Sequence, residues 1–321
     1  MRGLVWVSVF LLSVGSLFFL RWERLAYPTP ALSNTIFAIA SREALAADSV
    51  RFAVIGDYGW VSQQTQDVAT LVGGWNPDFV ITTGDNNYPS GEAATLDPNV
   101  GQYYHEFIAP YQGSYGAGGT INRFFPSLGN HDWVTEGAAP HLDYFTLPGN
   151  ERYYDFVRGP VHFFALDSDP HEPDGITITS TQAIWLEEKL GAATAPWKIV
   201  YFHHPPYTSS PRGPTPALRW PFEEWGATAI LAGHDHFYER ILRQETPYFI
   251  NGLGGRNIHT FSTPIPESQL RYNSDYGTML VEADTAQITF RFISRTGALV
   301  DEYVIQAPML RTSLYLPLLR R

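Results

Sequence analysis

The 321-residue chain contains no cysteine. This absence excludes disulfide bonds, thiolate zinc sites and a cysteine nucleophile. Any metal site must therefore use the oxygen and imidazole donors of histidine, aspartate, asparagine or tyrosine side chains.

Basic residues are also scarce, with 21 Lys and Arg against 32 Asp and Glu and a formal net charge of -11. This balance argues against a nucleic-acid partner, because a phosphate backbone requires clustered Lys and Arg. A small anionic substrate stays open, since bound cations would outweigh a diffuse acidic surface locally.

One long apolar run stands at the amino terminus. Residues 4–20 are LVWVSVFLLSVGSLFFL, with Arg2 before the run and Arg21 and Arg24 after it. The length lies between that of a signal-peptide core and that of a full membrane span. We therefore expect an exported protein, extracellular, periplasmic or on the cell surface, with either a cleaved signal or membrane attachment through residues 4–20.

From Val50 onward, short β-branched and aromatic runs alternate with helical stretches, which predicts an α/β fold. The five clearest runs are 50–57 (VRFAVIGD), 77–85 (PDFVITTGD), 123–132 (RFFPSLGNHD), 198–204 (KIVYFHH) and 228–236 (TAILAGHDH). All five end in polar residues. Because loops at the carboxyl ends of strands gather at one edge of an open α/β sheet, we expect these ends to converge.

The rest of the chain fits one folded domain at 49–307, between a signal or anchor with its linker at 1–48 and a tail at 308–321. Further strands are predicted at 153–157 and 161–167, and a three-strand meander at 278–305. A helix is predicted at 182–190, with Thr179 and Gln182 as a capping box and Ile184, Trp185 and Leu190 on its apolar side.

Seven potential metal ligands lie in the strand-end motifs: Asp57, Asp85, Tyr88, Asn130, His203, His234 and His236. Such a mixed set of oxygen and imidazole donors suits Fe, Mn or Zn better than Mg or Ca. Each residue alone has an ordinary explanation, since an Asp after a strand commonly caps a turn and a lone His is commonly structural. Only their joint order behind five strands indicates a metal site.

The motifs G-D-Y-G, G-D-N-N-Y, G-N-H-D and G-H-D-H-F-Y-E-R follow one another in this order. In this order the sequence resembles the calcineurin-like metallophosphoesterases. The Tyr three residues after the second Asp and the Tyr-Glu-Arg after the last His pair resemble the short, tartrate-resistant-type purple acid phosphatases. The segment 248–255 (YFINGLGG) is a minor part of the resemblance. The resemblance as a whole implies a metallophosphoesterase fold, in which two mixed β-sheets pack as a sandwich flanked by helices in four α/β/β/α layers.

The resemblance also implies a division of the ligands between two ions: Asp57, Tyr88 and His236 at the first, Asn130, His203 and His234 at the second, and Asp85 bridging them. Tyrosinate favours a trivalent ion, so Fe(III) is expected at the first position and Fe(II), Zn or Mn at the second. Two such ions activate water and stabilise in-line displacement at phosphorus. The expected activity is hydrolysis of phosphate monoesters, as in acid phosphatases, on a small phosphorylated substrate.

Three further residues are candidates for contact with the substrate. His131 follows Asn130, and His204 follows His203, so either ring can touch phosphate or protonate the leaving oxygen; His204 can instead simply shape its loop. Arg212 stands where short mammalian-type members carry another histidine. Arginine does not donate a proton at working pH, but it can hold a phosphate oxygen.

The remaining histidines match no motif and are expected to be structural or exposed: His105, His141, His162, His171 and His259. Two alternative functions stay open. One is a phosphodiesterase or nucleotidase of the same superfamily, and the other is a metal-stabilised surface module without turnover. The sequence indicates no oligomeric state.

Overall fold

The structure is a computed structural model that describes residues 49–308. The apolar run at 4–20 and the tail after residue 308 lie outside the described residues, so the division at 1–48, 49–307 and 308–321 stays a prediction. Within residues 49–308, no helix has both the length and the apolar character needed to cross a membrane.

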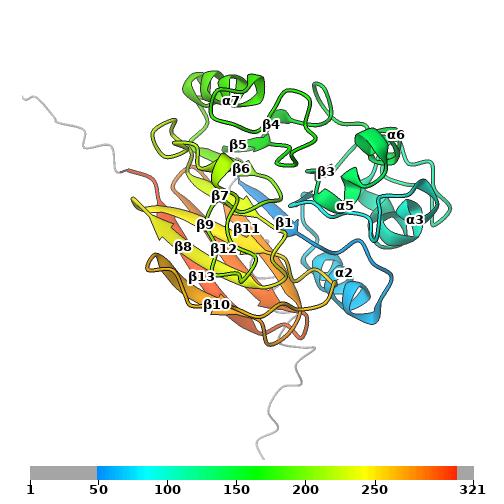
Figure 1. Ribbon diagram of the computed structural model, residues 1–321. Coiled ribbons are helices and arrows are strands. Elements are labelled where there is room, and N and C mark those ends of the chain that lie inside the picture. Colours follow the sequence, from blue (N-terminus) through cyan, green and yellow to red (C-terminus); the bar gives the residue numbers. More distant parts are fainter. Residues whose placement is uncertain (1–48, 309–321) are drawn as a thin grey trace, which may run out of the picture.

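The described chain has thirteen strands; the helices lie among the first seven of them, and β7 to β13 follow one another without a helix (Figure 1). The strands are β1 (Val50–Ile55), β2 (Phe79–Thr82), β3 (Phe124–Pro126), β4 (Tyr154–Arg158), β5 (Val161–Ala165), β6 (Trp197–Tyr201), β7 (Ala229–Ala232), β8 (Tyr238–Arg243), β9 (Thr246–Asn251), β10 (Ser268–Tyr272), β11 (Gly277–Ala283), β12 (Gln287–Ser294) and β13 (Leu299–Gln306). The helices are α2 (Gln63–Trp75), α3 (Ala93–Leu96), η1 (Asp97–Gly101), α4 (Gln102–Tyr104), η2 (His105–Phe107), α5 (Asn130–Trp133), η3 (Glu136–Ala138), α6 (Ala139–Tyr144), α7 (Thr181–Ala192) and η4 (Pro216–Leu218).

The strands form two mixed sheets. The first has six strands in the order β13-β12-β11-β1-β2-β3, and the second has seven in the order β10-β8-β9-β7-β6-β5-β4. Within the first sheet β1, β2 and β3 run parallel, and within the second β5, β6, β7 and β9 run parallel. The carboxyl ends of the parallel strands therefore lie together at one edge of each sheet.

Aromatic side chains from the facing sheets form the central core. Phe52 of β1 meets Phe163 of β5 edge-on, with ring centroids 5.0 Å apart, and Phe249 of β9 stacks on Phe290 of β12 at 4.8 Å. Burying each such side chain stabilises the fold by roughly 1.5–3 kcal/mol. Apolar burial thus holds the two sheets face to face.

Helices cover the outer faces of this sandwich (Figure 1). Leu186 and Leu190 of α7 pack in a second buried cluster with Val200 of β6, while Val72 of α2 joins the core beside the six-stranded sheet. The four α/β/β/α layers implied by the resemblance are therefore present.

All five predicted strand runs, the 153–167 hairpin and the carboxyl-terminal meander are confirmed. The predicted cap of α7 is wrong. Ser180 caps the helix by accepting a hydrogen bond from the N–H of Ala183 at 3.2 Å. Gln182 instead turns inward and hydrogen-bonds the backbone N–H and C=O of Asp167, each at 2.8 Å. Ile184 is 51% exposed, so it is not part of the apolar face.

Candidate metal centre

Three of the seven predicted ligands have a left-handed backbone two or three residues after the end of a strand: Asp57 (φ 56°), Asp85 (φ 54°) and His234 (φ 70°). This conformation is uncommon outside glycine, but Asp and His tolerate it, and it commonly marks a functional site. It turns the chain sharply out of the strand. The glycine before Asp57 is required by a close approach, because a Cβ on Gly56 would overlap the Thr83 side chain and the Asn251 carbonyl.

One group of donors surrounds the phenol of Tyr88. Its hydroxyl lies 3.1 Å from Oδ1 of Asp57 and 3.1 Å from Nε2 of His236. Asp57, Asp85 and His236 are all buried, and their ligand atoms lie within 4.8 Å of one another. This group contains the four residues expected around the first ion.

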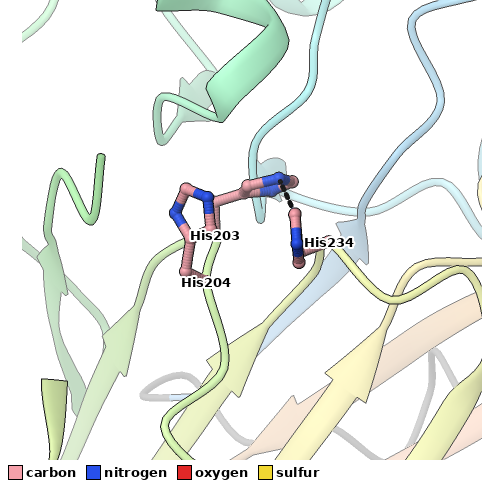
Figure 2. A group of neighbouring side chains, drawn as sticks. All are labelled: His203, His204 and His234. Carbon is pink, nitrogen blue, oxygen red and sulfur yellow. Dashed lines mark hydrogen bonds between the residues drawn. The ribbon is translucent and has the colours of Figure 1, made fainter. Parts of the chain in front are cut away.

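The second group lies beside it and is centred on Oδ1 of Asn130. This oxygen lies 3.1 Å from Nε2 of His203 and 3.0 Å from Nδ1 of His234. The two ring nitrogens are 3.2 Å apart, and the dashed line in Figure 2 marks this contact. Nε2 of His203 is also 3.3 Å from Oδ1 of Asp85. Asp85 therefore adjoins both groups.

The hydrogen bonds of the imidazoles show that this donor set fits cations. Nδ1 of His203 donates to the carbonyl of Thr83 at 2.8 Å, and Nδ1 of His236 donates to that of Asn257 at 2.6 Å. Nε2 of each ring therefore faces a carboxylate oxygen 3.3 Å away. A neutral ring would direct a bare lone pair at that carboxylate, and two acceptors at this distance repel each other unless a proton or a metal ion lies between them.

The pKa values of His203 and Asp85 also indicate that positive charge is favoured between these two side chains. Although burial opposes a charged ring, the Asp85 carboxylate raises the pKa of His203 to about 10. Burial favours the neutral acid for Asp85, but the positive charge of His203 holds the pKa of Asp85 well below its usual range. A proton shared by His203 and Asp85 would thus stand where a metal ion can satisfy both groups.

The sequence pattern that describes the calcineurin-like phosphoesterases matches residues 50–238. The chain belongs to this family. Human tartrate-resistant acid phosphatase type 5 is 23% identical over 306 residues, covering 78% of this chain and 89% of the relative. Purple acid phosphatase 17 of Arabidopsis thaliana is 24% identical over 300 residues, covering 83% and 87%. The chain is therefore a phosphoesterase distantly related to acid phosphatases, and its substrate is phosphorylated.

Solved structures share the fold of this phosphoesterase. Purple acid phosphatase PPD1 from yellow lupin (Lupinus luteus) seeds aligns with a TM-score of 0.66 and 17% identity, covering 80% of this chain and 54% of that one. GAP50, the anchor in the inner membrane complex of Plasmodium, aligns with a TM-score of 0.64 and 18% identity, covering 82% and 90%. At such identities these structures support the fold alone.

A buried carboxyl group ties two motif loops of the phosphoesterase together. Asp132 accepts hydrogen bonds from the backbone N–H and side-chain amide of Asn86, at 3.1 and 2.9 Å, and from the N–H of Gly129 at 2.9 Å. Burial, with the nearby charge of Asp85, raises the pKa of Asp132 to about 7. This network positions Asp85 and Asn130, which lie on the two loops that it joins.

His131 and His204 both lie beside the two donor groups, but their rings are held differently. His131 is 35% exposed at its side chain and donates from Nδ1 to the carbonyl of Pro89. The hydroxyl of Ser168 accepts the N–H groups of His203 and His204, at 3.2 and 2.9 Å, so its single proton points at Nδ1 of His204, 3.0 Å away. His204 therefore carries its own proton on Nε2 and is a donor.

Two residues that were not predicted as site residues lie against the centre, and both belong to the loop after β9. The ring of His259 stacks on that of His236, with centroids 3.9 Å apart and planes 11° apart. The guanidinium of Arg256 lies 4.4 Å above the Trp60 ring and 5.1 Å above the Tyr88 ring. The only sequence signal was their position just after the segment 248–255.

Arg212 is exposed and reaches this loop, with its Nη2 3.3 Å from Nε2 of His259. The other unassigned histidines have different surroundings. His162 pairs with Asp155 at 2.8 Å, for example, and His141 is buried in α6. His259 alone among the five unassigned histidines stacks on a predicted ligand.

Two cavities, of about 430 and 450 Å³, lie elsewhere on the surface. None of the seven predicted ligands lines either of them. The convergence of donors marks the candidate site better than either cavity does, because chemistry at phosphorus needs charge and positioned donors more than it needs an enclosed volume.

Proposed function

We propose that the chain is a binuclear metal-dependent hydrolase that cleaves small phosphate monoesters, as acid phosphatases do. The observation that carries this proposal is the presence of two adjoining donor groups that share Asp85. The first ion would be held by Asp57, Tyr88 and His236, the second by Asn130, His203 and His234, and both by Asp85. Four protein donors on each ion leave room for water and substrate.

When bound, the two ions supply a nucleophile from water near neutral pH and positive charge for the phosphoryl oxygens. The side chains around them bind and orient the ester. His204 presents Nε2–H as a donor to a phosphoryl or leaving-group oxygen, and Ser168 fixes that tautomer. His131 and Arg212 would contact the same phosphoryl group from the exposed side of the centre.

The proposed metals are Fe(III) beside Tyr88 and Fe(II), Zn or Mn at the other position. Burial and the neighbouring carboxylates of Asp85 and Asp57 raise the pKa of Tyr88 well above its ordinary value. Only an ion of high charge would therefore hold this side chain as a phenolate.

Metal analysis and a visible spectrum of protein purified without chelator test this proposal. We expect two ions per chain and a visible absorption band that Tyr88→Phe removes, together with turnover of p-nitrophenyl phosphate. Removal of the ions by a chelator should abolish turnover, and adding them back should restore it. A chain that binds two ions but turns over no phosphate ester would instead support the metal-stabilised module without turnover.

The phosphodiesterase or nucleotidase alternative uses the same donor set. The ratio of kcat/KM values for p-nitrophenyl phosphate and bis-p-nitrophenyl phosphate separates it from the monoesterase. A ratio below one would favour the diesterase.

We also propose that the protein is exported, on the strength of the apolar run at residues 4–20. Fractionation of cells producing the full chain tests this, and recovery of the whole protein in the cytosol would contradict it.

A further inference from the structure

The contact between Arg212 and His259 joins two donors. Nδ1 of His259 accepts a hydrogen bond from the backbone N–H of His236 at 3.0 Å, so it carries no proton. The ring proton must then be on Nε2, which lies 3.3 Å from Nη2 of Arg212. A guanidinium has five donors and no acceptor, so these two groups do not hydrogen-bond each other.

Arg212 and His259 therefore present two N–H groups, on Nη2 and on Nε2, side by side with no acceptor between them. Among residues 49–308, no carboxylate forms an ion pair with Arg212, although nine other arginine–carboxylate contacts are present. An anionic oxygen that accepts from both N–H groups would resolve the donor–donor contact. Charge-assisted hydrogen bonds of this kind are about twice as strong as neutral ones.

The pair also lies at the metal centre. His259 stacks on the predicted ligand His236 at 3.9 Å. The two donors thus lie beside a predicted ligand of the first ion.

We propose that Arg212 and His259 together form an oxyanion subsite that binds the additional anionic oxygen of a phosphate monoester and so selects monoesters over diesters. This inference rests on the proposed function and names its substrate class. A monoester has three non-bridging oxygens and a charge of about -1.5 to -2 near pH 7. In a diester the third of these oxygens bears carbon, carries no charge and is a poor acceptor, so the donor pair gains little from it.

The test uses the full metal-loaded chain and three variants. Arg212→Met removes the guanidinium. His259→Asn removes the Nε2–H donor, while its amide oxygen can still accept the N–H of His236. Arg271→Met is the matched control, since Arg271 is an exposed arginine on β10 whose side chain, among the residues that the structure describes, hydrogen-bonds only Ser268.

The first measurement compares kcat/KM for p-nitrophenyl phosphate and for bis-p-nitrophenyl phosphate. With Arg212→Met we expect the monoester value to fall about 10- to 100-fold, the range for hydrogen bonds to charged groups, and the diester value to fall less than about 3-fold. His259→Asn should lower the monoester value by about 5- to 10-fold. Because both donors share one oxygen, the double variant should lose less than the product of the single losses.

Binding of inorganic phosphate, measured by calorimetry on the same proteins, is independent of turnover. We expect Arg212→Met and His259→Asn to weaken phosphate binding by factors similar to those for the monoester, with metal content and melting temperature unchanged. Arg271→Met should leave both measurements at the wild-type value.

The outcomes separate the two proposals. Equal losses on monoester and diester, or no loss on either, overturn the oxyanion subsite and leave the phosphatase standing. A wild-type protein that hydrolyses neither ester overturns the proposed function. The calorimetric measurement then still decides the subsite, which is refuted if Arg212→Met binds phosphate as tightly as the wild type.

Discussion

The two sheets contribute different chemistry to one centre. Loops after β1, β2 and β3 of the six-stranded sheet supply the oxygen donors, whereas loops after β6 and β7 of the seven-stranded sheet supply the imidazoles. The oxygen donors are Asp57, Asp85, Tyr88 and Asn130, and the imidazoles are His203, His234 and His236. Each proposed ion takes donors from both sheets, so neither sheet contains a complete site.

The two halves are also positioned by different means. On the oxygen side, the carboxyl group of Asp132 joins two loops of one sheet through Asn86 and Gly129. On the imidazole side, backbone carbonyls orient the rings, and the carbonyl that orients His203 belongs to Thr83, which follows β2 of the opposite sheet. The packing of the two sheets against each other is therefore itself part of the site.

The largest effect is expected where the two halves meet. Asp85→Ala removes the donor shared by both groups, so we expect the bound ions to be lost and kcat/KM to fall at least about 10⁴-fold, the scale seen when one member of a catalytic unit is removed. Metal analysis and turnover of p-nitrophenyl phosphate measure this. The control is Asp143→Ala, at an exposed position on α6. A variant that still binds two ions would refute the shared role.

A change in the core between the sheets should disturb both halves of the site. Phe163 is fully buried against Phe52 and Phe79. Phe163→Ala should lower the free energy of unfolding by about 3–5 kcal/mol, because it leaves a cavity between the sheets. Metal affinity should weaken with it. Denaturant unfolding measures the change.

The control for Phe163→Ala is Val157→Ala, at a half-exposed position on β4. It should change the free energy of unfolding by less than about 0.5 kcal/mol. If Phe163→Ala keeps its free energy of unfolding but binds metal weakly, or loses stability but binds metal normally, then the packing of the sheets does not control the assembly of the site.

The smallest effect is expected on the imidazole side alone. Ser168→Ala removes the hydroxyl that directs the proton of His204 to Nε2, so kcat should fall about 10-fold while two ions remain bound. Steady-state kinetics with metal analysis measure this, and Ser114→Ala, at an exposed loop position, is the control. Unchanged kcat would mean that His204 only shapes its loop.

The elements that the sequence predicted well are those whose pattern is local. Every residue of β1, β2 and β7 is buried, β6 is interrupted only at Lys198, and each motif follows closely behind its strand. Local pattern failed at α7, where Thr179 and Ser180 are both competent caps and only the burial of Gln182 decides between them. The exposure of Ile184 depends on the same rotation of the helix.

His259 and Arg256 show what local pattern does not contain. Both follow β9 by a few residues, and nothing in their neighbours distinguishes them from an ordinary polar loop. Their proximity to His236 and Tyr88 arises because the loop after β9 folds back over the motif loops, where its backbone hydrogen-bonds His236 and Asp57.

Which donors exist, that none is a thiolate, and which strand each follows can be read from the sequence, because residue identity and short-range pattern fix these properties. The sequence does not show that donors from two sheets face one another at 3.0–3.3 Å, or that Arg212 and His259 lie 3.3 Å apart, and these facts come from the tertiary structure. Such distances depend on how the two sheets pack and how the long loops close over them. Those are long-range contacts that no short stretch of the chain encodes.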